Sequence, residues 1–150
     1  MSAVRRRLWW VVTAVSATFV LFGVSDVVGG IAFNTGFADA ISGSAPAQID
    51  AQHPELFRLI EAVVRAGGVS LATLGITFVA ISAFAYRPGQ RWAWWTMWLL
   101  PAWPMAIFAL FLVVGTAPGQ STPASILSDP IIAIIAAVVL LLDRSRFADA

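Results

Sequence analysis

The fold of this chain is decided by residues 8–28, which read LWWVVTAVSATFVLFGVSDVV. The stretch holds one charged residue, Asp26, near its far end, and it follows three consecutive arginines at residues 5–7. An α-helix rises about 1.5 Å per residue, so about 20 apolar residues cross the roughly 30 Å hydrocarbon core of a bilayer. The stretch therefore predicts a membrane-spanning helix. Because its apolar run exceeds the roughly 7–15 residues of a signal-peptide core, we expect a retained anchor.

Three further stretches have the same character. Residues 66–86 and 92–115 are apolar and uncharged, whereas residues 123–142 include Asp129. Proline is favoured at the first position of a helix, so both Pro123 and Pro130 could begin the fourth span. We expect a start near Pro123 and a bend at Pro130. The sequence thus predicts an all-α polytopic membrane protein, a four-helix transmembrane bundle that forms one domain over residues 1–150.

The composition supports this fold class. Of the 150 residues, 59% are hydrophobic and 11% are charged, whereas a soluble domain has about 45–50% and about 25%. These proportions exclude a soluble globular enzyme, a nucleic-acid-binding protein and a disulfide-stapled secreted module. The chain has no cysteine and one histidine, His53, so we expect no thiolate metal site, no bis-histidine haem and no bound metal or cofactor.

The arginines predict how the chain is threaded through the membrane. If the N-terminus is cytoplasmic, four spans place seven arginines and two acids inside, and two arginines and six acids outside. Positively charged residues favour the cytoplasmic side, so both termini are expected to be cytoplasmic. Tryptophans anchor at headgroup level, and five of them flank the inner arginines, at positions 9, 10, 92, 94 and 95. We expect a multi-pass protein of a bacterial inner membrane.

The outer segment, residues 29–65, is the largest stretch outside the predicted spans. It begins with glycine-rich turns and changes to a helical pattern at His53-Pro54, where His53 is interpreted as a helix-start residue. One apolar stripe follows at positions 56, 59, 60, 63 and 64. Arg58, Glu61 and Arg65 lie on the opposite face, with Glu61 and Arg65 spaced for an ion pair. This pattern predicts an outer amphipathic helix that continues into the second span.

Four ionisable residues are expected at a similar outer depth: Asp26, Glu61, Arg65 and Asp129. Charges at membrane depth are costly and usually pair with one another, so we expect an Asp26–Arg65 ion pair with the other two nearby. Alternatively, the two aspartates are simply interfacial, and Asp129 is a helix N-cap. A structural salt bridge is favoured over a reactive site. These four residues remain the catalytic candidates if the protein is an enzyme.

Two other patterns concern packing. Small residues at Gly68, Ala72 and Gly75 share one helical face, which favours close helix packing within the chain over a homodimer interface. In the third span, two prolines at positions 101 and 104 predict a kink. A kink beside Trp98 and Trp103 could open a cavity for a lipid or quinone-like tail, although aromatic residues in a span more often serve packing.

The layout resembles small four-span bacterial membrane proteins related to the DoxX family. The resembling features are the four spans with a cytoplasmic N-terminus, the outer loop, and the residues Arg65-Ala66-Gly67-Gly68 that open the second span. Some members of this group are linked to redox or respiratory accessory roles, so the resemblance implies a role of this kind. The lack of cysteine in this chain argues against a role that depends on thiol chemistry.

Two functional hypotheses remain open from the sequence. The first is a non-catalytic accessory, interaction or lipid-binding subunit whose partners are membrane lipids, other membrane proteins or a second copy. The alternative is a membrane-embedded enzyme or carrier that acts on a hydrophobic substrate through the outer carboxylate and arginine cluster.

Overall fold

The computed structural model describes residues 8–34, 39–40, 42–120 and 123–147, and within these ranges its regular secondary structure is entirely helical. Four helical stretches are long and apolar enough to cross a membrane: Leu8–Phe33, Pro54–Tyr86, Arg91–Val114 and Ile126–Arg146. The predicted number, order and helical type of the apolar segments are therefore confirmed.

The first two long segments are each extended by a change of helix type. Helix α1, Leu8–Gly29, continues into the short 3₁₀ helix η2, Gly30–Phe33. Helix α4, Pro54–Ile81, has 28 residues and passes into a π-helical turn, η3, Ser82–Tyr86. The amphipathic stretch and the second span thus form one helix, as predicted.

A short helix was not predicted from the outer segment. Helix α3, Pro46–Gln52, has proline at its first position, where the missing N–H costs nothing. Its start is also stabilised by Gln48, whose Oε1 accepts a hydrogen bond from the backbone N–H of Ala45 at 3.2 Å. His53 separates α3 from α4 and precedes the first residue of α4, so its interpretation as a helix-start residue is confirmed.

The third span is interrupted, but not at its prolines. It consists of α5, Arg91–Thr96, and α6, Leu99–Val114, with the break at residues 97–98. Pro101 lies in the first turn of α6, where backbone N–H groups have no intrahelical acceptor, and Pro104 lies inside the helix. The predicted kink is therefore displaced by one turn, because a new helix begins just before the first proline.

The fourth span begins where it was expected. Helix α7, Ala124–Asp143, follows Pro123 as its N-cap and contains Pro130 in its interior. The 3₁₀ turn η4, Arg144–Arg146, continues it.

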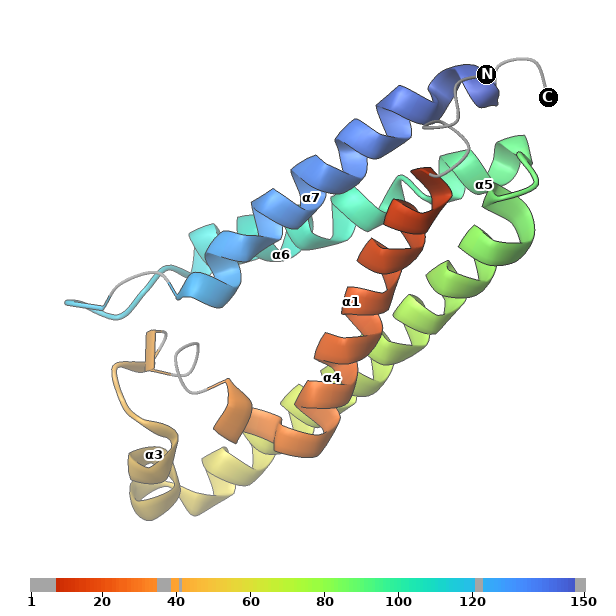
Figure 1. Cartoon of the computed structure of the whole chain (residues 1–150). Helices are drawn as coiled ribbons and strands as arrows, with labels where there is room; N and C mark the ends of the chain where they lie inside the picture. The colour runs from red at the N-terminus through yellow and green to blue at the C-terminus, as the bar shows by residue number, and fades with distance from the viewer. Residues whose placement is uncertain (1–7, 35–38, 41, 121–122, 148–150) are drawn as a thin grey trace.

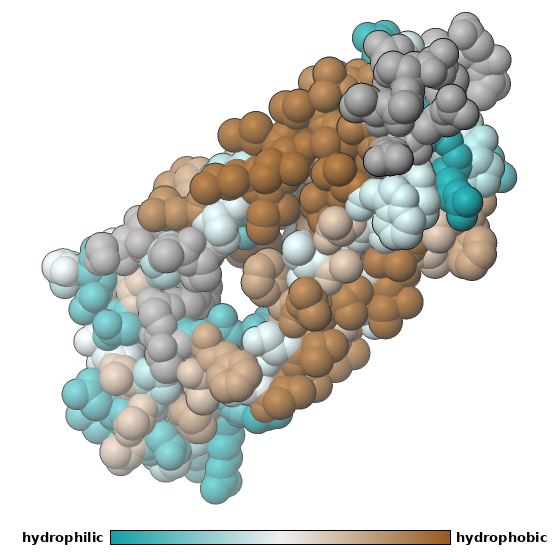
Figure 2. Space-filling model, viewed as in Figure 1, coloured by the Kyte–Doolittle hydropathy of each residue, from teal (hydrophilic) through white to brown (hydrophobic). Residues whose placement is uncertain are grey.

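The helices form two pairs (Figure 1). Helix α1 packs along α4, and α6 packs along α7. The pairs meet where α1 begins and α7 ends; this end, which also holds α5, is called the tryptophan end. At the opposite end, called the loop end, the backbone N–H of Ala117 donates to the carbonyl O of Ala40 at 2.7 Å. Between the two ends, an opening separates the pairs (Figure 2).

The hydrophobic core lies at the tryptophan end. The largest fully buried apolar side chains there are those of Phe78, Tyr86, Met97, Leu100 and Leu140. Hydrogen bonds also cross between elements within this region. For example, Thr13 Oγ1 lies 2.7 Å from Ser82 Oγ, and Trp94 Nε1 donates to the carbonyl O of Leu140 at 3.0 Å. Packing at this end holds the two pairs together.

Close backbone contact holds α1 against α4. A Cβ atom added at Gly68 would lie 2.7 Å from the carbonyl O of Gly23, and one added at Gly75 would lie 2.6 Å from the backbone N of Val20. A Cβ atom at Gly23 would in turn lie 2.6 Å from the carbonyl O of Gly68. The face of small residues on α4 therefore packs within the chain, as predicted, and α1 occupies the surface that a homodimer would have used.

Candidate functional site

The loop end of α1 turns at Gly30. This residue has φ +55°, a left-handed conformation that costs a residue with a side chain about 1–2 kcal/mol. A Cβ atom at Gly30 would also collide with the carboxylate of Glu61. Glycine is therefore required both by the backbone turn and by the approach of α4.

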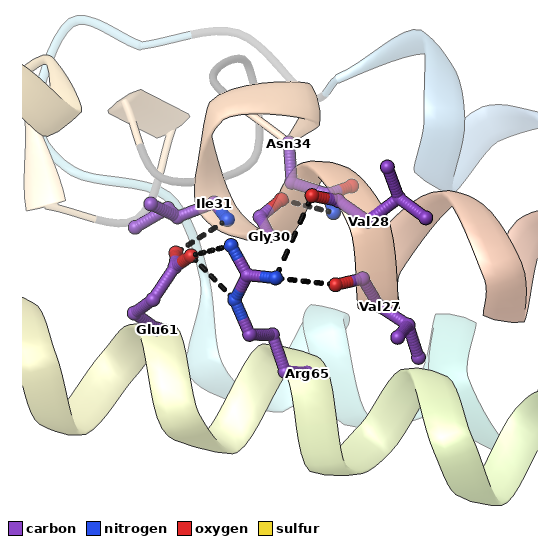
Figure 3. A network of polar contacts seen from close by, with 7 residues as sticks. All are labelled: Val27, Val28, Gly30, Ile31, Asn34, Glu61 and Arg65. Atoms are coloured by element: carbon purple, nitrogen blue, oxygen red, sulfur yellow. Dashed lines mark hydrogen bonds and ion pairs between the residues drawn. The ribbon is translucent and has the colours of Figure 1, made fainter.

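Glu61 extends from α4 to this turn (Figure 3). Its Oε2 accepts a hydrogen bond from the backbone N–H of Ile31 at 2.9 Å. Its Oε1 lies 2.6 Å from Nη2 and 2.7 Å from Nε of Arg65. The predicted ion pair between Glu61 and Arg65 is confirmed, and both carboxylate oxygens are engaged.

Arg65 caps the end of α1. Its Nη1 donates to the carbonyl O of Val27 and lies 3.5 Å from the carbonyl O of Val28. The last carbonyl groups of a helix have no intrahelical donor, and a cation beside them also interacts favourably with the helix dipole. We call Glu61, Arg65 and the backbone of residues 27–31 the loop-end clasp, because they tie the end of α1 to α4.

Asp26 has a different partner from the one predicted. Its Oδ1 accepts a hydrogen bond from Nδ2 of Asn34 at 2.8 Å, and the same amide group lies 3.4 Å from the carbonyl O of Gly30. The prediction of an Asp26–Arg65 ion pair is wrong. The turn at η2 brings Asn34 back over the end of α1, while the guanidinium of Arg65 is directed to the helix carbonyls.

Asp129 is separate from the clasp. It lies in the second turn of α7 and is half-buried, and in the ranges that the structure describes it forms no hydrogen bond or ion pair with Asp26, Glu61 or Arg65. The N-cap of α7 is Pro123, so the alternative interpretation of Asp129 as the N-cap is also wrong. The four catalytic candidates therefore do not converge on one point.

A cavity of about 470 Å³ lies at the tryptophan end. Arginine and aromatic side chains dominate its lining, which comprises Arg91, Trp94, Trp95, Trp98, Leu141, Arg144 and Phe147. Trp98, one of the two residues beside which a cavity was expected, lines it. Trp103 is not among the lining residues and is 43% exposed. That this space holds a lipid or quinone-like tail stays a prediction.

A buried polar cluster at the tryptophan end was missed by the sequence analysis. Asp143 and Tyr86 are fully buried and interact with each other. Arg146 lies 3.6 Å from the Asp143 carboxylate, measured from Nη1 to Oδ2, and donates to the carbonyl O of Arg87. The signal that could have revealed it is the i,i+3 spacing of Asp143 and Arg146 at a helix end. These groups join the end of α7 to the turn after η3.

No family model, curated protein or solved structure matches this chain. The resemblance to DoxX-related proteins therefore stays a prediction. Among the residues placed by the structure, no group of three or more His, Asp or Glu residues could hold a metal ion.

Proposed function

We propose that this protein is a non-catalytic, lipid-binding accessory protein of a bacterial inner membrane, with four spans and cytoplasmic termini. The observation that carries the proposal is the loop-end clasp. Its charged side chains, the best catalytic candidates in the sequence, are engaged in capping α1 and tying it to α4.

The clasp argues against the alternative of an enzyme or carrier that uses the outer cluster. A general acid or base must reach its substrate within hydrogen-bond distance. Glu61 already contacts Ile31 and Arg65, and Asp26 contacts Asn34, so catalysis would first require these contacts to break. Asp129, on α7, is not joined to them.

The separation of the helix pairs supports lipid binding. Large apolar side chains are exposed along both pairs, for example Leu21 at 68%, Ile131 at 59% and Leu110 at 59%. In a bilayer, acyl chains are as apolar as the helix side chains. Apolar helices therefore gain little free energy when they contact one another instead of acyl chains. The opening between the pairs (Figure 2) is therefore compatible with lipid chains packed between them.

Purification in a mild detergent followed by native mass spectrometry tests the proposal. We expect a folded protein that retains at least one phospholipid through gel filtration. Glu61→Gln and Asp26→Asn should retain the lipid at the wild-type ratio, because the clasp is structural. A monodisperse wild-type protein with neither lipid nor partner protein bound would overturn the proposal. If both variants stay folded but lose the lipid, the outer cluster, and not the rest of the bundle, is the binding site.

A further inference from the structure

We propose that the cavity at the tryptophan end binds the phosphate headgroup of an anionic phospholipid, held between Arg91 and Arg144. The inference rests on the proposed lipid-binding function and adds a site and a headgroup class to it. Four observations carry it: the state of the two arginines, the charge balance of the lining, the aromatic wall, and the place of the cavity along the spans.

Within the described part of the chain, the two arginines have no polar partner. Arg91 begins α5, Arg144 follows α7, and both are exposed. Neither side chain forms a hydrogen bond or ion pair with another residue in the described part of the chain. In contrast, Arg65 is held in the loop-end clasp and Arg146 is paired with Asp143. Two guanidinium groups that lack a partner among the described residues thus line one cavity, although they come from segments far apart in the sequence.

The charged side chains among the described lining residues are both positive. Among the residues that the structure describes, no acidic residue lines the cavity. Asp143 precedes Arg144 in the sequence, but it is fully buried and interacts with Tyr86 and Arg146. A guanidinium group presents a planar set of N–H donors that matches the oxygens of a phosphate, and basic pockets between helices at the cytoplasmic side are typical sites for anionic lipid headgroups.

The remainder of the lining is a rigid apolar wall. Trp94 is buried and fixed by its hydrogen bond to the carbonyl O of Leu140. Trp95 and Trp98 pack edge-on against it, with ring centroids 4.7 Å and 5.8 Å away. The buried Nε1 of Trp98 has no hydrogen-bond partner within the described structure. Such a wall suits the glycerol backbone and first methylenes of a lipid, which free phosphate lacks.

The place of the cavity fits a headgroup. Arg91 begins one membrane-length apolar helix stretch, Arg91–Val114, and Arg144 lies near the end of another, Ile126–Arg146. Leu141 lies one turn closer to the middle of its span than Arg144. The cavity is therefore charged where headgroups lie and apolar where acyl chains begin. Its volume of about 470 Å³ is within the range of about 300–1,000 Å³ that is usual for small-ligand sites.

Lipid titration followed by native mass spectrometry tests the site. The full chain is delipidated in detergent and titrated with phosphatidylglycerol or with phosphatidylcholine that carries the same acyl chains. Both lipids carry a phosphate, but the choline cation of phosphatidylcholine cancels the charge of its headgroup and is repelled by the two arginines. We therefore expect phosphatidylglycerol to bind about tenfold more tightly or better. The Arg91→Gln/Arg144→Gln double variant should lose this preference.

Matched variants separate the site from general charge effects. Arg58→Gln removes an exposed arginine from α4, far from the cavity lining, and should leave the affinity for phosphatidylglycerol unchanged. A double variant with lysine at both positions keeps the charge and should retain most of the binding. Thermal unfolding of each variant, followed by circular dichroism, shows that the variants are folded.

The outcomes distinguish this proposal from the general function. If the wild-type protein binds phosphatidylglycerol and the double glutamine variant binds it equally well, the site is wrong but lipid binding stands. Equal affinity for the two lipids overturns the assignment of an anionic headgroup. If the wild-type protein binds neither lipid, the proposed function itself is wrong. Displacement of bound lipid by excess inorganic phosphate would show that the site takes free phosphate, which also overturns the proposal.

Discussion

Replacing Gly68 by alanine should destabilise the α1–α4 pair. The added Cβ atom would lie 2.7 Å from both the carbonyl O of Gly23 and the Cβ of Asp26, and 2.9 Å from the backbone N of Val27. Carbon contacts are optimal at about 3.5–4.0 Å, so the helices would have to separate by about 0.8 Å or more along this contact. Two of the three neighbours are backbone atoms and cannot turn away. Overpacking of this kind costs about 1–3 kcal/mol.

Gly67 provides a matched control one residue away. It is exposed, and a Cβ atom added there would meet nothing within 4 Å. Alanine is favoured over glycine inside a helix by about 0.5–1 kcal/mol, so Gly67→Ala should stabilise the protein. The two substitutions have the same chemistry in the same helix and are predicted to have opposite signs.

Thermal unfolding in a mild detergent, followed by the circular dichroism of the helices, measures the difference. For a chain of this length, about 1 kcal/mol corresponds to roughly 2–4 °C in Tm. Gly68→Ala should lower Tm by about 2–12 °C, whereas Gly67→Ala should raise it slightly. If both variants have the same Tm, or if Gly68→Ala is the more stable one, the close approach of α1 and α4 is not the contact that holds them together.

Three further predictions concern the clasp and the threading. Gly30→Ala should destabilise the protein by about 1–2 kcal/mol through its left-handed backbone alone, and thermal unfolding measures this loss. Arg65→Met should lower Tm, because the carbonyls at the end of α1 and the carboxylate of Glu61 lose their cationic partner. Since Arg65 is 46% exposed, the difference in Tm from the wild-type protein should shrink in high salt. An unchanged Tm at low salt would contradict a capping role. The chain has no cysteine, so single cysteines report its threading without background. With Gln52→Cys, a membrane-impermeant maleimide should label intact spheroplasts, whereas with Pro88→Cys it should label only lysed ones; the reverse pattern would invert the predicted orientation.

The long helices could be predicted because their signal is local. A run of about 20 apolar residues and the residues that begin it suffice to place a span. Pro123, as the residue before α7, and His53, as the residue before α4, were both found in this way. The pairing of Glu61 with Arg65 was found for the same reason, since i,i+4 neighbours on a helix are adjacent whatever the tertiary structure.

The partner of Asp26 could not be predicted in this way. The sequence predicted Asp26 and Arg65 at a similar depth in the membrane and therefore as a pair. The partner that each residue has in the structure depends on the turn after α1. The left-handed backbone at Gly30 redirects the chain so that Asn34 meets Asp26, and the helix carbonyls then take Arg65. The role of Gly23 in helix packing was missed for a related reason. A glycine in an apolar helix can be assigned to a close contact only when the helix that packs against it is known, and here the contact is at Gly68.

The arginines at the tryptophan end have two separable effects. Their positive charge favours one orientation of the chain in the membrane, and two of them line the proposed lipid site. Threading requires only an excess of positive charge on one side, and arginines at any position near that side would provide it. It does not require that two of them line one cavity with three tryptophans and lack a partner among the described residues, as Arg91 and Arg144 do. Replacing both leaves five arginines on the side predicted to be cytoplasmic against two on the other, so the predicted orientation should persist. A loss of phosphatidylglycerol binding with unchanged cysteine labelling would therefore report on the cavity and not on the threading.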